Sequence, residues 1–218
     1  MGLLDYFWGA RKKTKANVKK EVSGKCQELL QWSGYWNQLV DADHYISRKE
    51  YQAELQQYTE TMRFFHSLDE NDILEDYCAK NGFDASQARG LYHKYEQADK
   101  LVEAANEAYL AARLIEEKEY LDHILKDVDP VIRLDDDQRR VVLSDEDYSL
   151  VVAGAGAGKT TTVAAKVKYL VEKQGIDPSQ ILIISFTNKA VKELRDKINE
   201  NLQIPCPIAT FHSTGNAI

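Results

Sequence analysis

The stretch that most constrains this chain is the glycine-rich run AGAGAGKTTT, from Ala153 to Thr162. The short apolar run SLVV comes directly before it, at residues 149–152, and β-branched runs of this kind are typical of a buried parallel strand. Apolar residues then recur with helical spacing from Val163 to Val171. A strand, a glycine-rich turn, a Lys-Thr pair and a helix, in this order, predict a phosphate-binding loop.

The chemistry of such a loop depends on its backbone. Glycines let the chain turn so that successive N–H groups point into one concavity, and the chain places them at Gly154, Gly156 and Gly158. A helix that starts near Lys159 adds its N-terminal dipole to this anion site. Lys159 can then reach the β- and γ-phosphates, and the Thr160 hydroxyl can ligate Mg²⁺. The general pattern begins with glycine where this chain has Ala153, and a glycine-rich turn without a ligand is the alternative.

Length and composition set broad limits. The 218 residues allow one large domain or two modest ones. The formal net charge of −7 combines a basic segment at residues 1–25 with an acidic remainder, and this balance does not decide between partners. No apolar run is long enough to span a membrane. The three cysteines are far apart and lack metal-binding spacing, which predicts reduced thiols in a cytoplasmic protein; they are Cys26, Cys78 and Cys206.

The first half of the chain predicts helices. Residues 1–20 join an apolar head to a basic tail that suits phosphates, lipid or an acidic partner, although a solvated helix start is the plainer interpretation. From Val22 to Leu125 nearly all residues fit helical patterns, with one heptad-like apolar stripe over 51–65 and another, on a single longer helix, over 91–115. We expect an antiparallel helical hairpin, coiled coil or small bundle in which the aromatic stripes form the core rather than base-stacking surfaces.

Local signals divide this region. Ser47 and Glu50 predict a capping box, Gly82 predicts the end of a short helix, and Asp84 predicts the next start. Pro130 breaks the helical region. The predicted domain boundary therefore lies near Asp129, with a helical region at residues 1–129 and a second domain at residues 130–218.

The second domain shows an α/β pattern. A buried strand is predicted at Ile181 to Ser185, followed by an amphipathic helix, and a third short strand at Ile208 to Thr210. Strands that alternate with helices predict a parallel sheet with right-handed crossovers. Ligands of such sheets bind at the carboxyl edge of the strands, so we expect the phosphate loop, Thr187 and Thr210 to emerge there.

Four stretches together carry a family resemblance: LDDDQRRVV, AGAGAGKTTT, ISFTNKAVKEL and TFHS. In order and spacing they resemble the start of the superfamily 1 DNA helicases of the UvrD/Rep type. More narrowly, the chain is similar to the helicase IV branch, in which a helical region precedes the motor. The resemblance covers about residues 134–218. It implies the first part of a RecA-like P-loop NTPase domain that uses ATP and Mg²⁺.

The resemblance also implies roles for individual residues. Gln138 corresponds to the glutamine that reads the adenine edge, and Lys159 and Thr160 form the catalytic pair that binds phosphates and Mg²⁺. The full nucleotide-binding set is Gln138, Gly154, Ala155, Gly156, Ala157, Gly158, Lys159, Thr160 and Thr161, without a separate role for Thr161.

Two later motifs are implied to bind single-stranded DNA. Their residues are Phe186, Thr187 and Asn188 in the first and Thr210, Phe211, His212 and Ser213 in the second. Hydroxyl, amide and backbone N–H groups hold phosphates without reading sequence, and an aromatic ring can stack on a base. Buried packing for Phe211 and a structural hydrogen bond for His212 are the alternatives.

ATP hydrolysis needs further residues that do not occur in the sequence up to Ile218. A strand that ends in Asp-Glu would hold Mg²⁺ and activate water, and arginines from a second motor domain would stabilise the transferred charge. The sequence is therefore interpreted as the N-terminal fragment of a longer enzyme. We expect it to bind nucleotide weakly or not measurably, and to show no DNA-stimulated turnover.

Three functions are compatible with these features. The first is an ATP-dependent DNA helicase that moves 3′ to 5′ on single-stranded DNA. The second is an ATP-driven recycling factor that binds RNA polymerase, or another protein, through the helical region; the intact FTNKAVKEL and TFHS stretches favour the first. The third is another P-loop protein such as a kinase, which leaves the joint occurrence of all four stretches unexplained.

Overall fold

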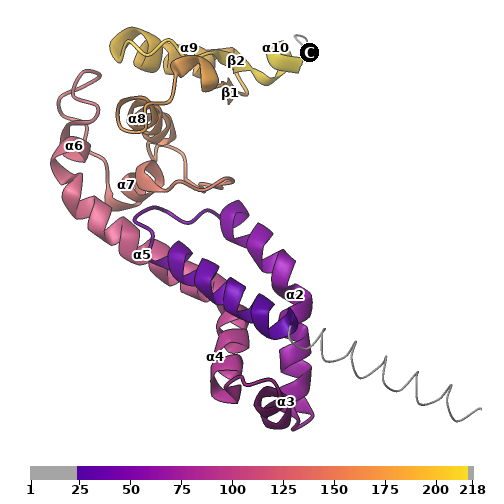
Figure 1. The fold of residues 1–218 in the computed structure, drawn as a ribbon. Coiled ribbons are helices and arrows are strands. Elements are labelled where there is room, and N and C mark those ends of the chain that lie inside the picture. The colour runs from indigo at the N-terminus through magenta and orange to yellow at the C-terminus, as the bar shows by residue number, and fades with distance from the viewer. Residues whose placement is uncertain (1–23, 216–218) are drawn as a thin grey trace, which may run out of the picture. The chain divides into compact units, whose positions relative to one another are not determined.

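The computed structural model describes residues 24–215, so the expectations for residues 1–20 lie outside the described part. The chain divides into two compact units, Met1–Glu107 and Ala108–Ile218, each considered by itself below (Figure 1). The predicted boundary near Asp129 lies inside the second unit and stays a prediction. Between residues 24 and 215, no helix is both long enough and apolar enough to cross a membrane.

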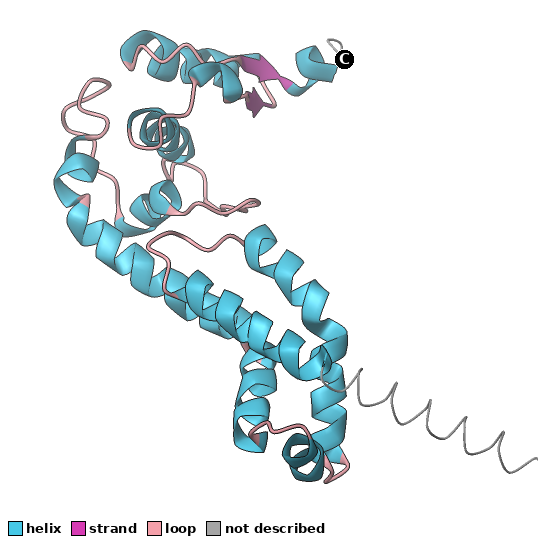
Figure 2. Cartoon of the chain, in the orientation of Figure 1, coloured by secondary structure: helices cyan, strands magenta, loops and turns pink. Residues whose placement is uncertain are grey.

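The first unit is built from helices, as predicted (Figure 2). Residues 24–40 are helical. Helices α2 (Arg48–Glu70), α3 (Leu74–Lys80) and α4 (Ala85–Glu96) follow, and α5 (Ala98–Glu116) runs from the first unit into the second.

The aromatic stripe of α2 lies in the core of this unit. Tyr58, Met62 and Phe65 are buried, and they share one hydrophobic cluster with Trp32 and Trp36. The rings of the two tryptophans stack with centroids 5.5 Å apart. Burying this much aromatic surface is a large stabilising contribution, and it confirms the interpretation of the stripe as core.

Some local predictions need correction. Ser47 caps α2 by accepting from the Glu50 N–H at 3.4 Å, but the Glu50 carboxylate bonds to His44 at 3.0 Å, so the capping box is only half formed. The single long helix predicted over residues 91–115 is two helices, because Gln97 leaves helical geometry with φ −101° and ψ 9°. Gly82 does follow the end of α3, with φ +64°.

The second unit contains the predicted α/β elements. Its helices are α6 (Lys118–His123), α7 (Asp136–Leu143), α8 (Lys159–Glu172), α9 (Asn188–Arg195) and α10 (Phe211–Gly215), with a 3₁₀ turn η1 (Pro178–Gln180) and a π-helical turn η2 (Asp196–Asn201). Strands β1 (Ile183–Ser185) and β2 (Ile208–Thr210) pair in parallel, with Ile183 opposite Ile208 and Ser185 opposite Thr210. The two later strands and their parallel pairing are therefore confirmed.

The strand predicted at residues 149–152 is wrong for this structure. These residues have no strand assignment, and the sheet among the described residues contains only β1 and β2. The side chain of Leu150 is 90% exposed and that of Val152 is 88% exposed. A buried parallel strand needs neighbouring strands and layers on both faces, and none of the described elements supplies them here.

Candidate functional site

The glycine-rich loop adopts a conformation that requires glycine at two positions. Gly156 has φ +79° and Gly158 has φ +76°, a region that residues with a Cβ avoid. The Ala157 N–H donates to the Gly154 carbonyl at 3.3 Å, which closes a tight turn. The chain then enters α8 at Lys159 with Gly158 as the N-cap residue.

The start of α8 is electrostatically suited to an anion. No side chain caps this helix, and its first turn carries no acidic residue. The first N–H groups of a helix lack intrahelical acceptors, and they carry the positive end of the helix dipole. The loop therefore presents uncapped backbone donors where a phosphate can bind.

Lys159 lies across the beginning of the same loop. Its Nζ donates to the carbonyl oxygens of Gly154 at 2.6 Å and Ala153 at 3.1 Å. The Thr160 side chain is partly exposed beside it. The ammonium group is thus held at the loop by neutral acceptors, which a phosphate oxygen can replace at little cost in geometry.

Gln138 lies next to the loop, 19 residues earlier in the chain. It is the third residue of α7 and forms a complete capping box with Asp135: the Gln138 N–H donates to Asp135 Oδ1 at 2.8 Å, and Gln138 Oε1 accepts from the Asp135 N–H at 3.1 Å. Gln138 Nε2 donates to the Ala157 carbonyl at 3.3 Å. A Cβ added to Gly158 would lie 2.6 Å from the same nitrogen, so the glutamine and the loop form one site.

Lys166 fixes the other end of α7, a role that no sequence motif indicates. This lysine of α8 donates from Nζ to the carbonyl oxygens of Val142 at 2.9 Å and Ser144 at 2.6 Å. Burial lowers the pKa of Lys166, and the nearby Asp145 carboxylate opposes that shift. Helix α7 is therefore tied to α8 and its loop at both ends.

Beside Lys159 lies a largely apolar cavity of about 290 Å³, lined by Val141, Val151, Ala153, Lys159, Thr162, Val163, Lys166 and Val167.

Thr161, the last residue of the expected nucleotide-binding set, has its hydroxyl 3.5 Å from Lys197 Nζ. Among residues 24–215, no group of three or more His, Cys, Asp or Glu side chains is placed to hold a metal ion.

The register of the sheet brings the two expected DNA-contact motifs to one edge. Ser185 pairs with Thr210 at the carboxyl ends of β1 and β2. Phe186 and Phe211 are the residues that directly follow this pair, one after each strand. Their side chains are 82% and 71% exposed. The alternative in which Phe211 packs in the interior does not describe this structure.

The other residues of these motifs are partly used for local structure. Thr187 caps α9 by accepting from the Ala190 N–H at 3.1 Å, and Asn188 is the first residue of that helix. Thr210 and Ser213 bond to each other, with the two hydroxyl oxygens 3.1 Å apart. His212 is exposed. No pairing connects the phosphate loop to the β1–β2 edge, so its place there stays a prediction.

Comparison with known proteins gives one family. Residues 134–218 match the sequence model of the UvrD/REP helicase N-terminal domain. The chain is 45% identical over 84 residues to a probable DNA helicase II homolog of Mycoplasma capricolum subsp. capricolum, an alignment that covers 37% of this chain and 12% of that protein. It is 40% identical over 85 residues to the ATP-dependent DNA helicase UvrD1 of Mycobacterium leprae, covering 37% of this chain and 11% of the relative.

A third relative, a probable DNA helicase of Mycoplasma pneumoniae, is 40% identical over 88 residues, which cover 38% of this chain and 16% of that helicase. The matched segment thus spans only a small part of each relative, and it contains Gln138, the glycine-rich loop and both aromatic motifs. Residues 134–218 are therefore similar in sequence to the UvrD/REP helicase N-terminal domain.

Proposed function

We propose that residues 134–218 form the nucleotide-binding and DNA-binding start of the motor of an ATP-dependent DNA helicase that moves 3′ to 5′ on single-stranded DNA. The observation that carries this proposal is the contact between Gln138 Nε2 and the Ala157 carbonyl, 3.3 Å apart. This contact supports the proposal, because an amide side chain can bond to adenine and Gln138 lies against the glycine-rich loop. Names of the related proteins support the same activity.

In this function the loop binds the triphosphate. The uncapped N–H groups at the start of α8 donate to phosphate oxygens. Lys159 exchanges its bonds to the Ala153 and Gly154 carbonyls for charge-assisted bonds to the β- and γ-phosphates. Because its ammonium group is already at the loop, little side-chain entropy remains to be lost.

Gln138 recognises the base. An amide side chain can bond in bidentate fashion to N6 and N7 of adenine. To do so, Gln138 gives up its bonds to the Asp135 N–H and the Ala157 carbonyl. Base binding is thereby linked to release of the loop carbonyl.

The site fits Mg²⁺ held mainly by the nucleotide. Mg²⁺ usually keeps several waters and takes one or two protein ligands together with substrate phosphates. In this proposal the Thr160 hydroxyl is the protein ligand that the loop offers to Mg²⁺. The metal neutralises phosphate charge when it is bound.

Single-stranded DNA binds at the β1–β2 edge. Phe186 and Phe211 offer exposed rings on which bases can stack. The Thr187 hydroxyl, the Asn188 amide and the His212 imidazole lie next to these rings in sequence. They suit contacts to phosphate and sugar, which carry no sequence information.

An NMR titration tests the nucleotide site. ATP with Mg²⁺, added to the ¹⁵N-labelled chain at millimolar concentration, should shift the backbone amide signals of residues 154–161 and the side-chain amide signal of Gln138. Weak binding is visible by this method. The Lys159→Met variant should lose these shifts and stay folded, because Lys159 is exposed. Shifts that avoid the loop, or that survive in Lys159→Met, would contradict the proposal.

A second titration tests the DNA site. A fluorescently labelled oligothymidine should bind the chain, and Phe211→Ala should weaken binding by about 1–3 kcal/mol for the lost stacking contact. Exposed Tyr148 provides a matched control, because Tyr148→Ala removes an exposed aromatic ring that belongs to neither motif. Equal affinities of the wild type and Phe211→Ala would exclude the ring from the DNA site.

A further inference from the structure

Helix α6, the residue before it and the turn after it carry polar side chains that pair with both helices of the proposed nucleotide site. All these residues belong to the second unit. The four residues concerned are named here the α6 bracket: Glu117, Tyr120, Asp122 and Asp127. Their partners lie 17 to 56 positions later in the chain, in or directly after α7 and α8.

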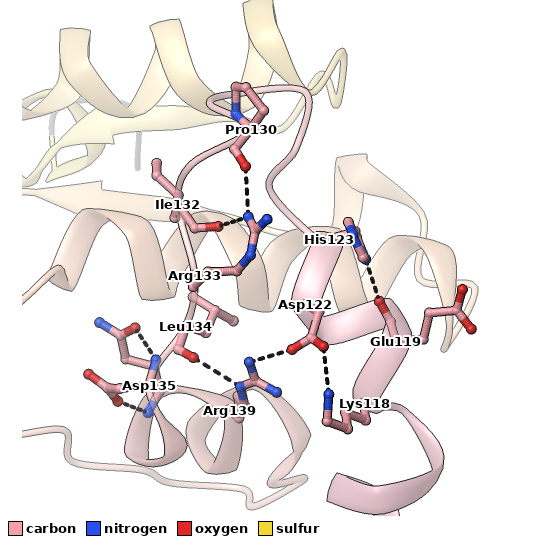
Figure 3. Close-up of polar contacts among 11 residues, drawn as sticks. Lys118, Glu119, Asp122, His123, Pro130, Ile132, Arg133, Leu134, Asp135 and Arg139 are labelled. Atoms are coloured by element: carbon pink, nitrogen blue, oxygen red, sulfur yellow. Dashed lines mark hydrogen bonds and ion pairs between the residues drawn. The ribbon is translucent and has the colours of Figure 1, made fainter.

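The contact to α7 is made by Asp122. Its Oδ1 accepts from Arg139 Nη2 at 2.6 Å, while Arg139 Nε donates to the Leu134 carbonyl at 2.9 Å (Figure 3). The Arg139 side chain is 14% exposed and that of Asp122 is 26% exposed, whereas Lys118, the other partner of Asp122, is 69% exposed. Lys118 and Arg139 together hold the pKa of Asp122 down at about 2, so the carboxylate is charged at neutral pH.

Three contacts join the bracket to α8 and its end. Asp127 pairs with the buried Lys168 at 2.8 Å. The Tyr120 hydroxyl donates to Glu172 at 2.8 Å, and burial, followed by this bond, raises the pKa of Tyr120. Glu117 pairs with Lys173 at 2.8 Å, and the Lys173 ammonium lies 4.6 Å from the centre of the Tyr120 ring. The bracket therefore contacts α8 near its C-terminal end, several turns after Lys159.

Arg139 is the neighbour of Gln138, which makes its anchoring relevant to the site. Successive residues of an α-helix differ by about 100° around its axis. Fixing Arg139 between Asp122 and the Leu134 carbonyl therefore fixes the rotation of α7, and with it the direction in which Gln138 leaves the helix. Because α7 has only eight residues, its own backbone bonds hold it weakly and tertiary contacts decide its position.

We propose that Asp122 is a positioning residue that sets the orientation of Gln138 toward the phosphate loop, with the rest of the α6 bracket holding α8 as the fixed reference. The effect of Asp122 on nucleotide binding rests on the proposed function, whereas the effect of Asp122 on the position of α7 is independent of that function. The bracket lies before residue 134, outside the matched helicase segment.

Hydrogen exchange and NMR on the 218-residue chain test the proposal without nucleotide. In Asp122→Asn, the amides of residues 138–143 should exchange about tenfold faster, and the side-chain amide signal of Gln138 should shift. Amides of α8 beyond Lys168 should keep their rates, because Asp127, Tyr120 and Glu117 still hold that helix. Asp122→Glu keeps the charge and should show a smaller increase, about threefold; it serves as the test variant if Asp122→Asn does not fold.

Lys118→Gln is the matched control, since it removes the exposed partner of the same carboxylate and should leave α7 unchanged. Unchanged exchange of α7 in Asp122→Asn, or a uniform increase over the whole second unit, would overturn the proposal. The ATP titration adds a functional readout: Asp122→Asn should weaken ATP binding about tenfold at unchanged fold. A wild-type chain that does not bind ATP contradicts the proposed function. The exchange data still test the positioning role of Asp122 in that case.

Discussion

At the scale of single residues, the site depends on Gly158 more than on the other glycines of the loop. Gly158 has a positive φ of +76°, and a Cβ there would meet Gln138 Nε2 at 2.6 Å. It also serves as the uncapped N-cap of α8. Gly154 has neither constraint, because nothing lies within 4 Å of its added Cβ and its φ is not in the left-handed region. Gly158 is thus required by the backbone and by its neighbour Gln138, whereas neither of these requirements applies to Gly154.

Gly158→Ala should therefore be damaging. The left-handed conformation costs a residue with a Cβ about 1–2 kcal/mol, and the Gln138 amide has to leave the loop. We expect a lower unfolding temperature of the second unit and loss of the ATP-induced NMR shifts. Gly154→Ala should leave the unfolding temperature nearly unchanged in the same calorimetric measurement. Equal behaviour of both variants would show that the close approach of Gln138 is unimportant.

Asp69 gives a pH-dependent contribution to stability. Bonds from Arg89 and then Tyr92 hold the pKa of Asp69 at about 2, whereas an unfolded chain has a pKa near 3.9. A depressed carboxyl pKa stabilises the folded state above the unfolded pKa, and that stability is lost as pH falls through the folded pKa.

Thermal unfolding of the wild type and Asp69→Asn checks this. The wild type should be the more stable protein from neutral pH down to about pH 4, and the difference should shrink as pH falls from there toward 2. A difference that stays constant over this range would exclude the Asp69 charge as its cause.

At the scale of elements, α7 is held mainly by side chains from outside it. The capping box with Asp135 fixes its start, and Lys166 binds two carbonyl oxygens at and beyond its end. Helices of this length are unstable on their own in water. The position of Gln138 is therefore a property of the neighbouring elements rather than of α7 itself.

Lys166→Met should loosen the end of α7. The variant keeps the apolar stem but removes the ammonium donor, which leaves the Val142 and Ser144 carbonyls without it at a cost of about 1–3 kcal/mol. Urea unfolding should show this loss, and hydrogen exchange should locate it at residues 140–144. The exposed Lys192 offers a control: Lys192→Met should change stability by less than about 0.5 kcal/mol.

At the scale of the whole molecule, the two units differ in how completely they bury apolar side chains. One cluster of buried residues, from Cys26 to Val102, fills the first unit. In the second unit, apolar side chains of the segment before the loop and of β1 remain exposed, among them Leu150, Val152 and Ile184. Burial of apolar surface is the main favourable term in folding, so the first unit has the more complete core.

A chain of residues 24–107 should therefore fold by itself. We expect a helical circular-dichroism spectrum, a cooperative thermal transition, and near-ultraviolet signals from Trp32 and Trp36, whose rings are stacked in the core. A broad transition without near-ultraviolet signals would indicate that the unit needs the rest of the chain.

The predictability of this protein follows from the range of the interactions involved. Helices α2 to α4, the strands β1 and β2, and the start of α8 after Gly158 were predicted because they follow from local spacing, glycine and capping residues. The prediction of a strand at residues 149–152 was wrong because the burial of a segment depends on the elements that pack against it. The apolar pattern of the segment does not reveal those elements. The break at Gln97 was missed because the apolar spacing continues across it.

What the sequence by itself determined is the chemistry available to the site: glycines for the turn, Lys159 and Thr160 after it, and Gln138 ahead of it. Only the tertiary structure decided where these groups lie. It gave Lys159 its two carbonyl acceptors, set Gln138 against Ala157, and paired Arg139 with Asp122. The physical reason is that residue spacing along one element fixes local conformation, whereas contacts between distant residues depend on how all the elements pack.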